Sequence, residues 1–256
     1  MKAMILAAGR GERMRPLTDR CPKPLLPVHG KPLIVWHIEA LACAGVRDII
    51  VNTAWLEDRL VEALGDGSRW GVRLAYSMEG RDHGGALETA GGIAKALPLL
   101  ADAGAADDAP FWLVSADVHA PEFGFDPAIA QRFSQGAEVA HLWLVPNPPY
   151  HPDGDFGLDA AGLGLADAPG PDGRRWTYAN LALMRPSLVR HIVPGSRVAL
   201  APLLFAAMRE RRISAEVWSG DWHNLGTPAQ LEALDRAPST RAHSANLTVC
   251  GMKEPR

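Results

Sequence analysis

The chain has 256 residues, of which 47% are hydrophobic and 21% charged, so it can bury a substantial core of ordinary globular composition. Its net charge of −3 gives no general attraction to nucleic acid or to an anionic membrane. The three cysteines, Cys21, Cys43 and Cys250, are scattered without metal-site spacing, which indicates reduced thiols. The apolar run at residues 3–8 is too short for a signal peptide and is followed at once by arginines. We therefore expect a cytoplasmic protein with no nucleic-acid or membrane partner.

The first predicted element is a short buried strand at residues 4–7. The loop after it contains Gly9 and Gly11, which allow backbone N–H groups to close around an anion. A triphosphate needs such amides together with an arginine fork and a lysine point charge. This pattern predicts a phosphate-binding loop, and the alternative is a plain connection with solvated basic side chains. The cations in and after the loop are Arg10, Arg13, Arg15 and Lys23, the last held between two prolines.

Two common glycine motifs are excluded. The dinucleotide-binding fingerprint requires a third glycine at position 14 and an acidic residue at the end of the second strand, where this chain has Met14 and Asn52. A P-loop requires a Gly-Lys-Ser/Thr triplet after a four-residue spacer, and none follows Gly9. The predicted loop therefore belongs to another class of phosphate-binding loop.

The opening sequence resembles the signature of the sugar-phosphate nucleotidylyltransferases. Residues 6–18 read Leu-Ala-Ala-Gly-Arg-Gly-Glu-Arg-Met-Arg-Pro-Leu-Thr, and residues 22–27 read Pro-Lys-Pro-Leu-Leu-Pro. The resemblance runs from residue 1 to about residue 236 and is strongest to the bacterial uridylyltransferases of cell-wall sugar recycling. It implies an α/β, Rossmann-like (GT-A-like) nucleotidyltransferase fold with a mostly parallel mixed sheet flanked by helices. It also implies Mg²⁺ as cofactor, with UTP and N-acetylmuramate 1-phosphate as substrates.

The resemblance also suggests which residues contact the nucleotide. Arg13 and Lys23 are expected to stabilise charge on the triphosphate. Backbone groups of the opening loop and of the 79–85 loop are expected to read the base. The full set of expected nucleotide-binding residues is Ala7, Ala8, Gly9, Gly11, Glu12, Arg13, Lys23 and Gly85.

The next part of the chain alternates between helix and strand. Residues 32–45 predict a helix, 48–52 a strand, 57–64 a helix and 72–77 a strand. Short connections between such elements favour parallel strands, whose carboxyl ends lie at one edge of the sheet. We therefore expect any ligand at that edge.

A glycine-rich loop at 78–87 is predicted to lead into a helix at 88–97. Gly91 and Gly92 near its start would allow close approach by a ligand, and free amides there favour an electronegative one. Alternatively, Thr89 simply caps the helix. The resemblance places this segment beside the base and the sugar, with Glu88 among the sugar-binding residues.

Residues 98–110 are predicted to be an irregular, mobile connection before a strand at 111–115. Asp117 follows that strand, where a lone carboxylate is most often part of a turn or a cap. Here it lies at the same predicted edge as the phosphate loop. The resemblance makes Asp117 the magnesium ligand and a catalytic residue together with Arg13 and Lys23, and it places Ser115 beside the sugar.

A helix opening at residue 126 and a long apolar strand at 138–145 are predicted next. The segment 154–157 contains Asp155, whose carboxylate can accept hydrogen bonds from sugar hydroxyls according to the resemblance; the alternative is a hairpin turn. A strand at 178–184 follows, and Asn180 interrupts its apolar alternation. We expect Asn180 to face the sugar.

The last predicted elements are a helix at 201–212, a strand at 213–219 and a helix that opens with a capping box at Thr227. Asn224 stands where most members of the family have an aspartate that joins the metal site. An amide oxygen can bind a hard cation but brings no charge, so we expect weak metal binding without nucleotide. The nucleotidyltransferase domain is predicted to span 1–236, with a polar, disordered tail at 237–256.

The mechanism that these residues imply has no covalent enzyme intermediate. The sugar phosphate oxygen attacks the α-phosphorus in line, and pyrophosphate leaves from the opposite side. Magnesium on Asp117, helped by Asn224, would offset the repulsion between the phosphates. Two alternatives stay open: guanylyl or thymidylyl transfer to a hexose phosphate, and a catalytically weak nucleotide-sugar sensor. The sequence leaves the oligomeric state open.

Overall fold

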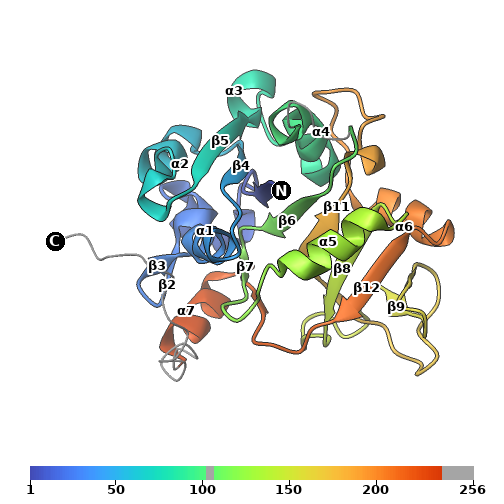
Figure 1. The fold of residues 1–256 in the computed structure, drawn as a ribbon. Helices are drawn as coiled ribbons and strands as arrows, with labels where there is room; N and C mark the ends of the chain where they lie inside the picture. Colours follow the sequence, from blue (N-terminus) through green and yellow to red (C-terminus); the bar gives the residue numbers. More distant parts are fainter. Residues whose placement is uncertain (102–106, 238–256) are drawn as a thin grey trace.

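A seven-stranded mixed sheet lies at the centre of the computed structural model, which describes residues 1–101 and 107–237 (Figure 1). The strand order is β12-β8-β11-β6-β1-β4-β5. Strands β6, β1, β4 and β5 are parallel, and β11 is antiparallel to both β6 and β8. This confirms the predicted sheet. Its strands are β1 (Ala3–Leu6), β4 (Asp48–Thr53), β5 (Arg73–Met78), β6 (Phe111–Ser115), β8 (Ala140–Val145), β11 (Thr177–Met184) and β12 (Ile213–Val217).

Helices cover both faces of this sheet (Figure 1). Side chains of α1, α2 and α5 pack with one face, and those of α4 and α6 pack with the other. Along β1, Ala3 and Ile5 join the first core and Met4 joins the second, as the two-residue period of a strand requires. The helices are α1 (Leu33–Cys43), α2 (Glu57–Leu64), α3 (Glu79–His83), α4 (Glu88–Leu100), α5 (Pro127–Gln135), α6 (Ala201–Arg209) and α7 (Pro228–Arg236).

Three short pairs of strands lie outside the main sheet. Of these, β7 and β13 are antiparallel and join the segment after β6 to the segment before α7. The pairs are β2 (Pro27–Val28) with β3 (Lys31–Pro32), β9 (Gly157–Leu158) with β10 (Gly164–Leu165), and β7 (Val118–His119) with β13 (His223–Asn224). The β7–β13 pair therefore brings two distant predicted site segments together.

Most predicted elements form with ends shifted by a few residues, but one segment predicted as a loop was wrong. Residues 79–83 form α3 where a loop was expected, because the Glu57 carboxylate accepts the N–H groups of Gly80 and Arg81 at 2.9 Å each. Helix α6 ends at Arg209, three residues early, and Arg211 adopts a left-handed backbone with φ of 58°. The predicted connection at 98–110 also begins later, since α4 extends to Leu100; residues 102–106 lie outside the described part.

Helix α7 packs against the opening loop in a third apolar cluster. Leu231 and Leu234 of α7 lie there with Met14, Leu26 and other buried residues. Thr227 caps this helix as predicted, since its Oγ1 accepts from Gln230 N at 3.3 Å. The Gln230 side chain accepts from the Gly226 N–H at 2.8 Å, one residue before the N-cap of a regular capping box. The segment that carries Asn224 is therefore anchored beside the predicted phosphate loop.

No helix in the described ranges is long and apolar enough to cross a bilayer. Cys21 and Cys43 are free thiols, and Cys250 lies outside the described residues. Residues 238–256 of the predicted tail also lie outside them. The domain boundary, the disordered tail and the cytoplasmic location remain predictions.

Candidate active site

Two adjoining cavities open at the carboxyl ends of the parallel strands. The smaller cavity measures about 340 Å³ and the larger about 690 Å³, and Leu6, Thr89 and Ser115 line both. Parallel strands place their following loops at one edge, which is why segments so distant in sequence meet here. The smaller cavity is lined by residues 6–10, 23–24, 52, 86, 88–89 and 115–117.

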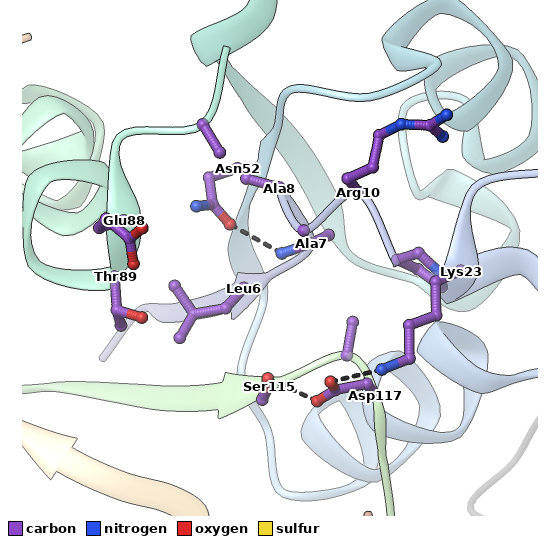
Figure 2. Close-up of a pocket in the computed structure, with 14 residues that line it drawn as sticks. Leu6, Ala7, Ala8, Arg10, Lys23, Asn52, Glu88, Thr89, Ser115 and Asp117 are labelled. Atoms are coloured by element: carbon purple, nitrogen blue, oxygen red, sulfur yellow. Dashed lines mark hydrogen bonds and ion pairs between the residues drawn. The ribbon is translucent and has the colours of Figure 1, made fainter. Parts of the chain in front are cut away.

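The central feature of the smaller cavity is an ion pair (Figure 2). Lys23 Nζ donates to Asp117 Oδ2 at 2.7 Å, and Ser115 Oγ donates to Asp117 Oδ1 at 2.8 Å. The Lys23 side chain is 11% exposed and that of Asp117 is 32% exposed. Burial raises the pKa of Asp117, but the Lys23 ammonium and the Ser115 hydroxyl outweigh it and hold that pKa below its usual value. Asp117 is therefore an ionised carboxylate open to the cavity.

The opening loop presents backbone groups to the same cavity. Gly11 has φ of 68°, and a Cβ atom there would lie 3.0 Å from Thr18 Cγ2, so only glycine fits without strain. Thr18 Oγ1 donates to Gly11 O at 2.8 Å and fixes the turn. In the described part of the chain, the N–H groups of Ala8 and Gly9 have no hydrogen-bond acceptor. These two amides can therefore bind an anion.

Arg10 and Arg13 line different cavities. Arg10 lines the smaller one, and its guanidinium carbon stacks 3.5 Å from the centre of the Trp55 ring. Its side chain points away from the Lys23–Asp117 pair (Figure 2). Arg13 lines the larger cavity beside Gly226, where a Cβ atom would lie 3.1 Å from its Nη2. Lys23 and Arg13 thus border the two cavities from the same loop.

Several residues of the opening and 79–85 loops lie outside both cavities: the cation Arg15 and three expected nucleotide-binding residues, Glu12, Gly11 and Gly85. Arg15 is exposed and pairs with Asp19 at 2.8 Å. Glu12 is exposed and pairs with Arg10 at 3.3 Å. Gly85 does not line the smaller cavity, whereas its neighbour Ala86 does. Gly11 shapes the loop without lining a cavity.

The larger cavity contains the residues predicted for the sugar from the second half of the chain. Asp155 accepts from the Tyr178 N–H at 2.8 Å and lies 3.0 Å from His151 Nε2. Asn180 has φ of 58° and lies where the register between β11 and β8 shifts, which removes it from the regular ladder. Of the other two predicted sugar residues, Glu88 lines only the smaller cavity and Ser115 lines both.

The start of α4 differs from the prediction. A Cβ atom on Gly91 would lie 2.2 Å from Ser196 O, and one on Gly92 would lie 2.5 Å from Glu79 Oε1. The missing side chains of both glycines therefore leave room for neighbouring protein atoms and not for a ligand. The N–H groups of Ala90 and Gly91 are also occupied, because both donate to Val198 O, at 2.9 and 3.1 Å.

Thr89 does not cap the helix either. The N-cap residue of α4 is Leu87, which makes no side-chain capping bond. Thr89 instead lines both cavities, and Figure 2 shows it at the smaller one. Sequence reasoning missed it as a site residue, and it also missed Asn52 and Tyr150, which line the smaller and the larger cavity. For Asn52 a signal existed, since it is a polar residue near the end of a buried parallel strand.

Asp117 and Asn224 can contribute to a metal site. Asn224 pairs with Val118 across β13 and β7, and Leu225 N donates to Asp117 O at 3.0 Å. Among residues 1–101 and 107–237, no three His, Cys, Asp or Glu side chains could hold a metal together. Asp117 lines the smaller cavity and Asn224 the larger, so the two adjacent segments offer one carboxylate and one amide oxygen. Mg²⁺ is commonly held by one or two carboxylates and completes its shell with phosphates and water. The residues therefore fit a magnesium ion that arrives with nucleotide.

The Rossmann-like mixed sheet, with a glycine-containing loop and an acidic residue at one edge, is the fold of a nucleotidyltransferase. The sequence profile of the family described as Nucleotidyl transferase matches residues 2–162. The chain belongs to this family, which confirms the predicted family and class of enzyme.

Relatives agree with this assignment. The chain is 47% identical, over 91% of its length and 96% of the other, to the N-acetylmuramate alpha-1-phosphate uridylyltransferase of Neisseria meningitidis serogroup B. It is 28% identical to the glucose-1-phosphate thymidylyltransferase of Streptomyces griseus, over 92% of this chain and 65% of that one. A crystal structure of a Bacillus anthracis protein, assigned as a glucose-1-phosphate thymidylyltransferase in complex with sucrose, aligns with a TM-score of 0.72 and 20% identity, covering 92% and 94% of the two chains. That likeness supports the fold.

Proposed function

We propose that the chain joins UTP to N-acetylmuramate 1-phosphate and releases UDP-N-acetylmuramate and pyrophosphate. The observation that carries this proposal is the Lys23–Asp117 ion pair, partly buried in the cavity wall, beside the free amides of the opening loop and next to a second cavity with polar walls. The relative of Neisseria meningitidis, similar over nearly its whole length, supports the choice of uridine and of the sugar. The reaction would take place in the cytoplasm and serve cell-wall sugar recycling.

Each of the two cavities binds one substrate. The nucleotide lies in the smaller cavity, with its phosphates on the amides of Ala8 and Gly9, and the sugar lies in the larger one against Asp155 and Asn180. The sugar phosphate oxygen attacks the α-phosphorus in line, and the bond to pyrophosphate breaks. Lys23 and Arg13 stabilise the negative charge that develops on the transferring and leaving phosphates.

The chain holds the reacting phosphates without a covalent intermediate. Asp117, with Asn224 beside it, would hold Mg²⁺, which when bound supplies positive charge against the repulsion between two anionic phosphates. Lys23 keeps the Asp117 carboxylate ionised before nucleotide binds. Ser115 fixes the orientation of that carboxylate through its hydroxyl.

A pyrophosphate-release assay tests this function. UTP, GTP and dTTP are each offered with N-acetylmuramate, glucose and mannose 1-phosphates in the presence of magnesium. We expect kcat/KM for UTP with N-acetylmuramate 1-phosphate to exceed every other pair by at least about tenfold, or about 1.4 kcal/mol. Preference for another base or sugar would contradict the substrate assignment, and no turnover with any pair would favour the nucleotide-sugar sensor.

Asn224 gives a separate prediction about the metal. In an Asn224→Asp variant, a charged ligand replaces a neutral one, so the variant should bind Mg²⁺ without nucleotide more tightly than the wild type does. It should also reach half-maximal activity at a lower magnesium concentration. Calorimetric titration of the free protein and a magnesium titration of activity at saturating nucleotide measure both effects. Identical midpoints in the two proteins would place Asn224 outside the coordination sphere.

A further inference from the structure

A chain of three buried hydrogen bonds links the opening loop to the turn before α4. The Ala7 N–H donates to Asn52 Oδ1 at 2.8 Å, as Figure 2 shows. Asn52 Nδ2 donates to Glu79 Oε1 at 2.7 Å, and the Leu87 N–H donates to Glu79 Oε2 at 2.8 Å. Asn52 is 3% exposed and Glu79 is fully buried. A buried carboxylate that is separate from the Lys23–Asp117 pair therefore connects three segments around the smaller cavity.

Asn52 fixes the first peptide unit of the loop. Leu6 pairs with Asn52 at the end of the parallel β1–β4 ladder. On the other side, the Leu6 carbonyl accepts the Ala116 N–H at 2.9 Å. The peptide that joins Leu6 to Ala7 is thus held from both neighbouring strands. The first backbone groups of the loop that are free to bind a ligand are the Ala7 carbonyl and the Ala8 N–H. Of the two backbone groups of Ala7, only the carbonyl can therefore contact the nucleotide.

Glu79 determines which way the Asn52 amide points. Both Glu79 oxygens face N–H donors, so a proton on the carboxyl would face a donor and break one bond. Burial outweighs the hydrogen bonds from Leu87 and Asn52 and the charge of Lys95, so the pKa of Glu79 lies above its usual value. The two N–H donors that face its oxygens favour the ionised carboxylate. Because the Asn52 nitrogen donates to the carboxylate, its oxygen must face Ala7. Glu79 therefore acts on the loop through Asn52.

The packing around this network explains Gly92. A Cβ atom on Gly92 would lie 2.5 Å from Glu79 Oε1 and 2.8 Å from Asn52 Nδ2. Any other residue in that place would displace the carboxylate or the amide. The glycine of α4 thus serves the network and not the ligand directly.

We propose that Asn52 and Glu79 are positioning residues for the nucleotide, which hold the first peptide of the opening loop and the 86–87 turn in place before the nucleotide binds. This inference rests on the proposed function only in assigning the smaller cavity to a nucleoside triphosphate. A loop ordered in advance spends less binding free energy on its own ordering. Loss of the network should therefore weaken nucleotide binding and leave the sugar phosphate site unchanged.

Exchange of the two functional groups tests the proposal. Glu79→Gln places an NH₂ group against a donor, and Asn52→Asp places a carboxylate oxygen against Glu79. Each single variant should raise the KM for UTP and its Kd at least about tenfold, with the KM for the sugar phosphate unchanged within about twofold. In the double variant Asn52→Asp/Glu79→Gln, the donors and acceptors match again at unchanged net charge. Its Kd for UTP should return to within about threefold of the wild-type value.

Glu57→Gln is the matched control. Glu57 also accepts two backbone N–H groups, from Gly80 and Arg81, but within the described ranges its side chain forms no hydrogen bond or ion pair with the opening loop. This variant should lose thermal stability and keep its nucleotide KM. An equal rise in KM would show that general loosening of this segment causes the effect and would overturn the proposal. A folded double variant that binds UTP no better than the single variants would overturn the proposal as well. If a single variant does not fold, the Kd of the double variant for UTP alone tests the proposal.

The test of the network and the test of the proposed function can fail independently of each other. The Kd for UTP, measured by calorimetry, does not depend on the sugar. Turnover of another sugar phosphate by the wild type, together with the expected Kd pattern, would reject the proposed substrate and keep the network. Normal uridylyl transfer with unchanged Kd in both single variants would reject the network and keep the function.

Discussion

Replacement of Lys23 by methionine should lower kcat at least about 100-fold, which corresponds to about 3 kcal/mol of transition-state stabilisation. Methionine keeps an unbranched apolar stem, which can pack where the buried lysine stem lies against the Gly11 turn. Only the ammonium that donates to Asp117 is lost. The measurement is steady-state pyrophosphate release at saturating UTP and sugar 1-phosphate.

Arg15→Met is the control from the same loop. Arg15 is an exposed cation paired with Asp19 and lines neither cavity, so its loss should change kcat by no more than about twofold. Thermal unfolding of both variants separates catalysis from stability. If Arg15→Met lowers kcat as much as Lys23→Met, the cavity lysine has no special role; if Lys23→Met loses activity only as far as it unfolds, the role of Lys23 is structural.

The same variant should change the pH dependence. In the wild type, the lowered pKa of Asp117 means that its stabilising contribution is present above the unfolded-state pKa and is lost as pH falls through the folded-state value. Without the Lys23 ammonium, its lowering effect on the pKa of Asp117 is lost, so that pKa should rise above its wild-type value. The acid limb of the activity profile should therefore move to higher pH in Lys23→Met. An acid limb at the wild-type position would show that Asp117 does not control it.

The sequence predicted the edge of the sheet at which the site lies because parallel strands constrain their loops. Apolar strands followed by Gly9 and Asp117 alternate with helices, and this order places both residues at one edge. Asn52 lies near the end of a strand at the same edge, but it was not predicted as a site residue. The structure has them all on the smaller cavity. Local pattern and chain topology were sufficient for that much of the site.

Partners distant in sequence could not be predicted. The residues around Gly80 carry no signal that the Glu57 carboxylate accepts their N–H groups and stabilises α3. Likewise, the residues around Gly91 carry no signal that the Val198 carbonyl accepts the N–H groups at the start of α4. The left-handed backbone of Asn180 likewise arises from a register shift against β8. Such contacts depend on the packed structure, because the residues involved have no periodic or local signal.

Asp117→Asn should have the largest effect on turnover. The variant keeps the size of the side chain and can still accept from Lys23, but it removes the charge that would hold the divalent cation. Removal of that charge should lower kcat about 1,000-fold, or about 4 kcal/mol. The loss is measured as kcat at saturating UTP and sugar 1-phosphate over a magnesium titration. A raised magnesium concentration should restore only part of the lost kcat.

Nucleotide binding without metal distinguishes this role from a structural one. The wild type presents an anionic carboxylate at the wall of the cavity proposed for the triphosphate, and the Asp117→Asn variant presents a neutral amide there. In the presence of a chelator, the variant should therefore bind UTP at least as tightly as the wild type, while magnesium should tighten binding in the wild type alone. Weaker binding of UTP by the variant under chelation would show that Asp117 shapes the cavity instead of holding the cation. Equal tightening by magnesium in both proteins would mean that the phosphates bind the cation without Asp117.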